Sequence, residues 1–156
     1  MVITYYGLSC FKVSSGDYTL AFDPPSKESS LRSPRFQADV VFISHGHDNH
    51  SGIDVIAEKE GKAPLAITGP GEYETRGIPI YGIPSWHDEK GGAKEGGNTI
   101  YTIELEDIRL CHLGDFGERE LRDETLEAVG AVDILFLPIG GETVMDAATA
   151  AAVANR

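Results

Sequence analysis

The run ADVVFIS, residues 38–44, constrains the fold more than any other segment of the chain. It is apolar without interruption from Val40 to Ile43 and rich in β-branched residues. A strand that lacks polar alternation is typical of a sheet covered on both faces. A similar run, VDILFLPIG, covers residues 132–140. The sequence therefore predicts buried strands in an α/β (α+β) fold and suggests two similar halves.

Short β-rich segments divided by Gly, Pro and Ser turns fill most of the remaining chain. We expect strands over 2–6, 10–13, 18–22, 65–68, 73–75, 78–84, 99–105 and 108–111. Ser51 and Asp54 form a capping-box pattern before a short apolar stretch that ends at Gly61, which predicts a helix there. Two further helices, over 119–129 and 147–154, are expected to flank a strand at 133–138.

Length and charge limit the classes of function. The 156 residues suggest one domain over 1–156, and 25 acidic against 13 basic side chains give a net charge of -12. A surface of that sign repels a phosphate backbone, so broad nucleic-acid binding is disfavoured. One local basic or metal-lined cleft could still accept a phosphate.

The chain shows no features of export or membrane insertion. The N-terminal segment MVITYYGLSCFKV has no basic region followed by a long apolar one, and no apolar run reaches the roughly 18 residues of a membrane span. Cys10 and Cys111 are far apart and form no CxxC pattern. We therefore expect a cytoplasmic protein with buried free thiols rather than a disulfide.

Three histidines follow the first apolar run directly, in ISHGHDNH. Side chains two apart in an extended segment leave the same face, so His45 and His47 can chelate one ion. His50 lies beyond a turn and can approach from another side. Imidazole is the commonest metal ligand among side chains, so this cluster predicts a metal site rather than a solvated loop.

Two further candidate ligands also follow expected strands. His87 stands in PSWHDEKGG and Asp115 in CHLGDFG. Taken alone, a single histidine such as His87 or His112 is more often structural, and Asp115 could be a turn carboxylate. The histidine cluster favours a ligand role for His87 and Asp115. An ion held by these residues with an open position would acidify bound water and supply hydroxide.

The motifs together resemble those of the metallo-β-lactamase superfamily. The pattern is H-x-H-x-D-H after a buried strand, then a lone His, then Gly-Asp after another strand. More narrowly, the chain resembles the metal-dependent hydrolases grouped with ascorbate-6-phosphate lactonase. The segments that carry this likeness are ITYYGLSCFKV, AFDPP, GPGEYE, NTIYTIE, CHLGDFG and LPIGGETVMDA. They span nearly the whole chain.

The resemblance implies a four-layer αββα sandwich with a dinuclear metal site at one edge of the sheets. By position, His45, His47 and His87 would bind the first metal, while Asn49 and His50 would bind the second. Asp115 would bridge the two ions, and His112 would be a neighbour of the site rather than a ligand. The resemblance also makes Asp115 and Asn49 the candidate catalytic residues.

The chain departs from the family pattern in two places. The family aspartate is Asn49 here, and an amide oxygen carries no negative charge and cannot act as a base. Asp48 is present but stands one residue early. The family also expects a further strand ending in a histidine after the last helix, whereas this sequence stops at AAAVANR. We therefore expect a C-terminally truncated domain with one tight metal site and one weak site.

The preferred interpretation is a hydrolase that uses a metal-bound hydroxide on an ester, lactone or phosphodiester. One alternative is a metal-binding but catalytically weak scaffold or sensor, and another is a nuclease of the same superfamily. Zinc is the expected metal, although His and carboxylate ligands also suit manganese, iron or nickel. We expect a small-molecule substrate, no membrane partner and no nucleic acid. The sequence is compatible with a monomer and with a homo-oligomer.

Overall fold

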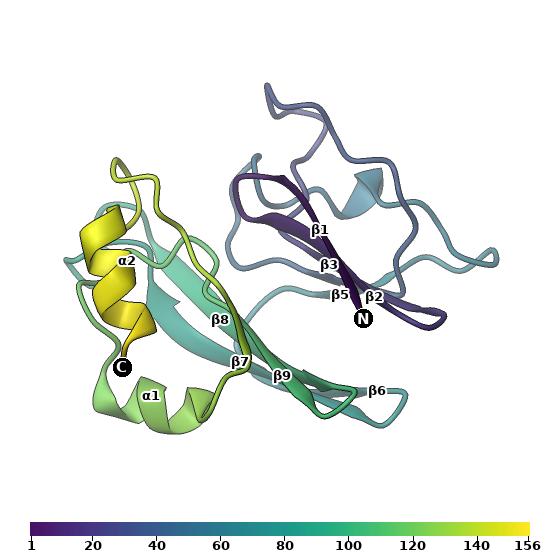
Figure 1. Cartoon of the computed structure of the whole chain (residues 1–156). Helices are drawn as coiled ribbons and strands as arrows, with labels where there is room; N and C mark the ends of the chain where they lie inside the picture. The colour runs from purple at the N-terminus through teal and green to yellow at the C-terminus, as the bar shows by residue number, and fades with distance from the viewer. The chain divides into compact units, whose positions relative to one another are not determined.

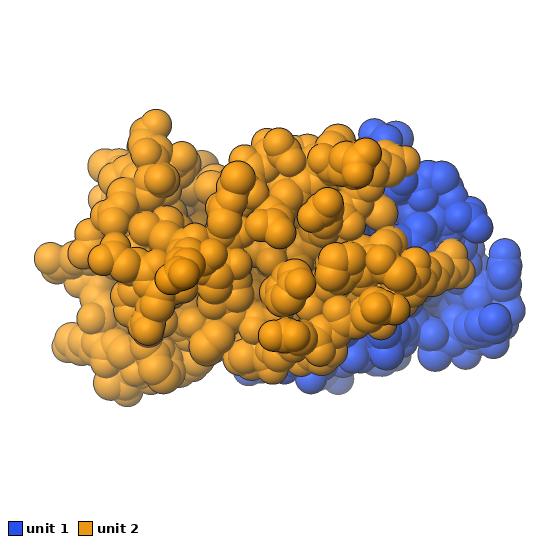
Figure 2. All heavy atoms as spheres, turned by 90° about the horizontal axis from the view of Figure 1, so that it is seen from below, with its two compact units in different colours: residues 1–68 blue, residues 69–156 orange.

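The computed structural model describes residues 1–156, which form two compact units. The first unit is Met1–Thr68 and the second is Gly69–Arg156, coloured blue and orange in Figure 2. The expectation of a single domain over 1–156 stays a prediction.

The first unit contains one five-stranded sheet with the order β1-β2-β3-β4-β5 (Figure 1). The first three strands form an antiparallel meander, and β4 and β5 then add in parallel to β3. Every residue of β3 and β4 is buried, and the apolar run at 38–44 predicts this burial for β4. The strands are β1 (Val2–Gly7), β2 (Cys10–Ser15), β3 (Tyr18–Phe22), β4 (Val40–Phe42) and β5 (Leu65–Ile67).

The second unit contains a five-stranded sheet with the order β10-β9-β8-β7-β6. Strands β6 to β9 are antiparallel to their neighbours, and β10 pairs with β9 in parallel. Side chains of both helices pack with this sheet in one apolar cluster that includes Leu113, Phe116 and Val153. The elements are β6 (Gly71–Thr75), β7 (Ile78–Trp86), β8 (Gly97–Leu105), β9 (Ile108–His112), α1 (Asp123–Val129), β10 (Ile134–Phe136) and α2 (Ala147–Ala154). Neither helix is long and apolar enough to cross a membrane.

Hydrogen bonds around β4 and β10 support the suggestion of two similar halves. The carboxylate of Asp39, one residue before β4, accepts from the backbone N–H of Thr19 at 2.8 Å. The carboxylate of Asp133, one residue before β10, accepts from Arg109 N–H at the same distance. In both pairs the aspartate N–H also donates back to the carbonyl of its partner. Each parallel strand is thus aligned on its neighbour by an equivalent aspartate.

The helix predicted directly after the histidines is wrong, because only a 3₁₀ turn, Ile53–Val55, forms there. The backbone N–H of Gly52 donates to the Pro24 carbonyl, and Ala57 N–H donates to Phe36. A Cβ on Gly52 would lie 2.4 Å from the Pro25 carbonyl oxygen, so this close approach requires glycine. A tertiary partner therefore takes the Ala57 N–H, which a helix would have directed to the carbonyl of Ile53.

The helix predicted over 119–129 begins only at Asp123. The residues just before it are tied to the end of β7 instead. The Glu118 carboxylate accepts from Trp86 N–H at 3.1 Å, and the Arg122 guanidinium donates to the Pro84 carbonyl at 3.3 Å. Side-chain tethers that a periodicity argument does not detect shorten this helix by four residues.

Candidate metal-binding residues

A buried carboxylate organises the start of the histidine loop in the first unit. Asp23 follows β3 directly, is fully buried and has a φ of 41°, in the left-handed region. Its Oδ1 accepts from the backbone N–H of Ser44 at 2.7 Å, and its Oδ2 accepts from the Ser44 hydroxyl at 2.6 Å. Because β3 and β4 are parallel, their carboxyl ends meet at one edge of the sheet. Asp23 therefore holds Ser44, the residue at which the histidine loop begins, in place.

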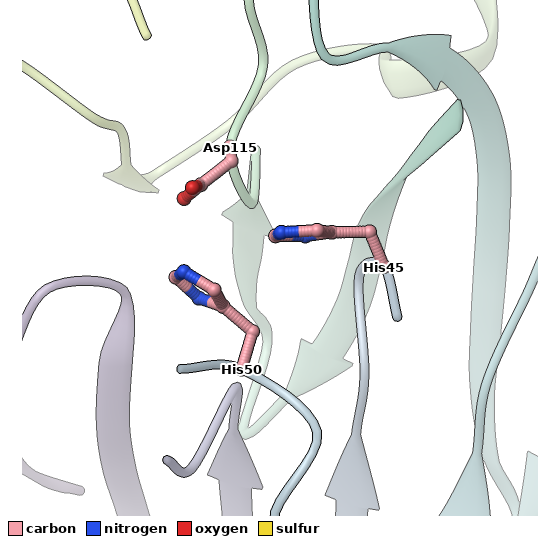
Figure 3. A group of neighbouring side chains, drawn as sticks. All are labelled: His45, His50 and Asp115. Carbon is pink, nitrogen blue, oxygen red and sulfur yellow. The ribbon is translucent and has the colours of Figure 1, made fainter. Parts of the chain in front are cut away.

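The three histidines of this loop lie close together. The ring centroids of His45 and His50 are 4.5 Å apart, and the His47 ring lies 6.2 Å from the first and 5.9 Å from the second. Figure 3 shows the His45 and His50 rings beside one another. His50 is buried, His45 is half-buried and His47 is exposed. The loop thus gathers its imidazoles through a turn, and the chelation of one ion by His45 and His47 stays a prediction.

Hydroxyl groups contact the Nδ1 atoms of two of these rings. The Nδ1 of His45 lies 2.9 Å from the Ser44 hydroxyl oxygen, and the Nδ1 of His50 lies 2.5 Å from that of Ser9. The Nδ1 of His50 is also 4.0 Å from Asp23 Oδ2. His47 differs, because its Nδ1 accepts from the backbone N–H of Asn49 at 3.3 Å.

The Asn49 side chain is engaged in a contact with another loop. Its Oδ1 accepts a hydrogen bond from the Ser29 hydroxyl at 2.6 Å. Ser29 also accepts from Leu31 N–H, and Ser26 N–H donates to the Asp48 carbonyl at 2.7 Å. The amide oxygen at position 49 therefore helps to join the histidine loop to the polar loop at 26–34.

In the second unit, His87 and Asp115 form a pair. The Nε2 of His87 lies 3.4 Å from Asp115 Oδ2. Burial alone would lower the pKa of His87, but the hydrogen bond and negative charge of Asp115 outweigh it, so this pKa is raised above its ordinary value. Figure 3 shows Asp115 on the loop that follows β9. The two residues predicted from their places after strands are thus brought together.

A buried amide holds the Asp115 loop in place. Asn98, only 3% exposed, accepts from Asp115 N–H at 3.1 Å. Its amide group donates to the Ser85 hydroxyl and to the Leu113 carbonyl, both at 2.8 Å. Close in sequence to Asp115, the N–H of Gly117 donates to the Trp86 carbonyl. The end of β7 and the loop after β9 are therefore joined beside both candidate ligands.

His112 lies in β9, almost fully buried, with its ring centroid 6.2 Å from that of Phe136. Its assignment as a neighbour rather than a ligand stays a prediction, as do the ligand roles of the other residues. Sequence reasoning missed the supporting residues Ser9, Asp23, Ser44 and Asn98. A polar residue directly after a buried strand, as in AFDPP, was the available signal for Asp23.

Comparison with known proteins places the chain among hydrolase-like sequences. A family model described as the β-lactamase superfamily domain matches residues 2–156. A metal-dependent hydrolase from Alkaliphilus metalliredigens is 31% identical over 94% of this chain and 76% of its own length. Another, from Thermococcus onnurineus, is 27% identical over 92% of this chain and 74% of its own length.

Solved structures show the same fold. A Thermotoga maritima protein, assigned as a Zn-dependent hydrolase of the metallo-β-lactamase superfamily, superposes with a TM-score of 0.77 at 30% identity. The match covers 98% of this chain and 69% of that protein. A protein from Parabacteroides distasonis superposes with a TM-score of 0.74 at 20% identity, over 97% of this chain and 76% of its own, and shows the fold alone. The fold predicted from the motifs is confirmed.

Proposed function

This chain belongs to the β-lactamase superfamily, and from that membership we propose that it is a metal-dependent hydrolase of esters, lactones or phosphodiesters. The observation that carries the proposal is the grouping of ligand-type side chains within each unit. His45 and His50 lie together in one loop, and His87 lies against Asp115. The names of the relatives as metal-dependent hydrolases support the same function.

The donor atoms fit a divalent transition metal. His45 and His50 each offer an imidazole nitrogen, and Asp115 offers a carboxylate oxygen. Nitrogen with carboxylate ligation suits zinc first, and manganese, iron or nickel as well. Following the family, we assign His45, His47 and His87 to a first ion and His50 with Asn49 to a second. Asp115 is assigned to both ions.

A divalent ion held by these residues would lower the pKa of a coordinated water and polarise the substrate. The protein's own contribution is to hold the ligands in fixed orientations. Asn98 fixes the Asp115 backbone through a 3.1 Å hydrogen bond, and Asp23 fixes Ser44 beside His45. Supporting hydrogen bonds that orient ligand side chains commonly raise the affinity of a site for its metal.

The second ion is proposed to bind more weakly than the first. Asn49 provides a neutral amide, and its oxygen already accepts from Ser29. This observation favours a second candidate function, a metal-binding protein of low catalytic activity that acts as a scaffold or sensor. The nuclease alternative is less favoured, because a net charge of -12 opposes binding of a nucleic-acid backbone.

Metal content and turnover test the proposal together. Metal-free protein is titrated with Zn²⁺ or Mn²⁺, bound metal is counted by elemental analysis, and hydrolysis of a generic lactone and of bis(4-nitrophenyl) phosphate is followed. We expect one tightly bound ion, a second weaker one, and metal-dependent turnover. Tight metal binding without turnover would support the scaffold or sensor instead. A protein that binds neither metal would contradict both candidates.

Substitution of single histidines separates ligands from neighbours. His47→Ala is expected to abolish tight metal binding, whereas His112→Ala should retain most of it, because His112 matches no ligand position. Elemental analysis of both purified variants checks this expectation. Equal loss of metal in the two would show that the lone histidine of β9 is assigned wrongly.

A further inference from the structure

Two serine hydroxyls stand where they can select the tautomer of two of the candidate ligands. A neutral imidazole carries one proton, so protonation of Nδ1 leaves Nε2 with the lone pair that a metal requires, and the reverse holds. Ser44 contacts Nδ1 of His45 and Ser9 contacts Nδ1 of His50. The direction of these two hydrogen bonds therefore decides which nitrogen is available.

At His45 the direction follows from a count of protons. The Ser44 hydroxyl has a single proton, and it donates this proton to Asp23 Oδ2 at 2.6 Å. The 2.9 Å contact with His45 Nδ1 then requires the imidazole to donate. Asp23, as a carboxylate, can only accept, and its other oxygen takes the Ser44 backbone N–H. His45 is thereby held with its proton on Nδ1.

At His50 the same carboxylate acts through its charge. Asp23 Oδ2 lies 4.0 Å from His50 Nδ1, and both side chains are buried. A negative charge at that distance, away from water, favours a proton on the nearer nitrogen. The Ser9 hydroxyl, 2.5 Å from Nδ1 and itself 7% exposed, then accepts from this N–H.

We propose that Ser44 and Ser9, anchored by Asp23, are positioning residues that hold His45 and His50 as Nδ1–H tautomers, with Nε2 presented for metal binding. The proposal rests on the metal-binding function proposed above. His47 provides an internal contrast, because its Nδ1 accepts from Asn49 N–H and no hydroxyl holds that nitrogen protonated. Hydrogen bonds within the metal-free protein thus hold two of the three imidazoles in the tautomer that metal binding requires.

The tautomers can be measured directly in metal-free protein. Long-range ¹⁵N–¹H NMR spectra of ¹⁵N-histidine-labelled protein at about pH 8, where an ordinary imidazole is neutral, distinguish the two tautomers. We expect Nδ1–H patterns for His45 and His50 and not for His47. A predominant Nε2–H form at His45 and His50 would overturn the proposal, whether or not the protein binds metal. Failure of the wild type to bind zinc would instead contradict the proposed function alone.

Serine variants then test the link to metal affinity. Ser44→Ala should lose the Nδ1–H pattern at His45 only, and Ser9→Ala at His50 only. Each should weaken zinc binding by about 10- to 100-fold, measured by competition with a chelating dye, as loss of such supporting hydrogen bonds commonly does. Ser44→Thr keeps the hydroxyl and is expected to restore the pattern. Circular dichroism checks that every variant is folded.

Ser51→Ala is the matched control, because this serine lies in the same loop and the hydroxyls hydrogen-bonded to its imidazoles are those of Ser9 and Ser44. It should leave both the tautomers and the zinc affinity unchanged. If Ser44→Ala and Ser51→Ala weaken zinc binding equally while the His45 spectrum stays unaltered, the serine has only a general structural role and the inference is wrong.

Discussion

Asn49 differs from a ligand carboxylate by one group, yet the physical consequences are large. The amide is neutral, so it adds nothing to the attraction of a cation. Its oxygen also accepts from Ser29 at 2.6 Å, which draws the side chain into the contact between two loops. At the scale of single residues, this position combines a proposed weak ligand with an observed hydrogen bond between two loops.

Asn49→Asp should raise occupancy of the second metal. The new carboxylate can still accept from Ser29, so the loop contact survives while a full negative charge is added beside the ion. We expect the second ion to bind about 10- to 100-fold more tightly, by analogy with the effect of supporting ligands. Isothermal titration with Zn²⁺ measures both sites. Asp48→Asn controls for general charge, and an equal and opposite change in that variant would contradict a ligand role for residue 49.

Cys10 and Cys111 are free and buried, as predicted. Burial raises the pKa of each thiol from an ordinary value of 9.0 to about 12, assisted at Cys10 by Asp23 and opposed at Cys111 by Arg109. Because the folded pKa exceeds the unfolded value, the stabilising effect is complete below pH 9 and is lost as the pH rises toward 12.

We therefore expect both thiols to resist alkylation by iodoacetamide at neutral pH until the protein is unfolded. The decline in stability above pH 9 should also be shallower in the Cys10→Ala, Cys111→Ala double variant than in the wild type. Urea unfolding across this range measures the difference. Rapid labelling of native protein would show that the thiols are more accessible than their burial implies.

At the scale of elements, alternation and apolar runs predicted every strand to within a few residues. Between β8 and β9, Glu106 and Asp107 both adopt positive φ and connect the two antiparallel strands in a tight hairpin. The helix after the histidines was wrong because Gly52 packs on Pro25, a contact between segments that no local pattern contains. Of the candidate site, the ligand-type residues were predictable from position, whereas Asn98 and Ser9 act through contacts distant in sequence.

Gly117 sets the distance between the loop after β9 and the end of β7. A Cβ at this position would lie 2.2 Å from the His87 carbonyl oxygen, and the φ of this glycine is not in the left-handed region. Gly117→Ala should therefore separate the two segments through steric overlap alone. We expect a loss of about 1–3 kcal/mol in the free energy of unfolding and weaker metal binding, because His87 and Asp115 lie on these segments.

Urea unfolding and zinc titration of Gly117→Ala measure the two effects. Gly97→Ala is a suitable control, because nothing lies within 4 Å of a Cβ there and the residue is exposed in β8. That variant should be neutral or more stable by about 0.4–1 kcal/mol. If both alanines behave alike, close packing on His87 is not what requires glycine at 117.

At the scale of the whole molecule, the two halves share a construction but differ in chemistry. Asp39 and Asp133 align equivalent parallel strands, yet only the loop after β4 carries histidines, while the segment after β10 reads LPIGGET. The similarity of the halves therefore explains the fold and not the function. The acidic excess acts on the molecule as a whole. A net charge of -12 attracts any cation, and repulsion among the acidic groups disfavours the compact state.

Stability should consequently depend on metal in two separable ways. Any divalent cation screens the acidic surface, whereas a transition metal is proposed to bind the imidazoles of the folded protein as well. At a free Zn²⁺ concentration about 100 times the dissociation constant, specific binding adds about 2.7 kcal/mol. For a chain of this length that corresponds to a rise of roughly 5–10 °C in the melting temperature. Mg²⁺ at equal concentration, a poor partner for imidazole, measures screening alone.

Differential scanning calorimetry of metal-free wild type, His45→Ala and His87→Ala, each with either cation, separates the two contributions. We expect Zn²⁺ to exceed Mg²⁺ only in the wild type, because each variant removes a ligand assigned to the first ion. A Zn²⁺ effect that is no larger than that of Mg²⁺, or that survives both substitutions, would show that the acidic surface and not the histidines accounts for the dependence on metal.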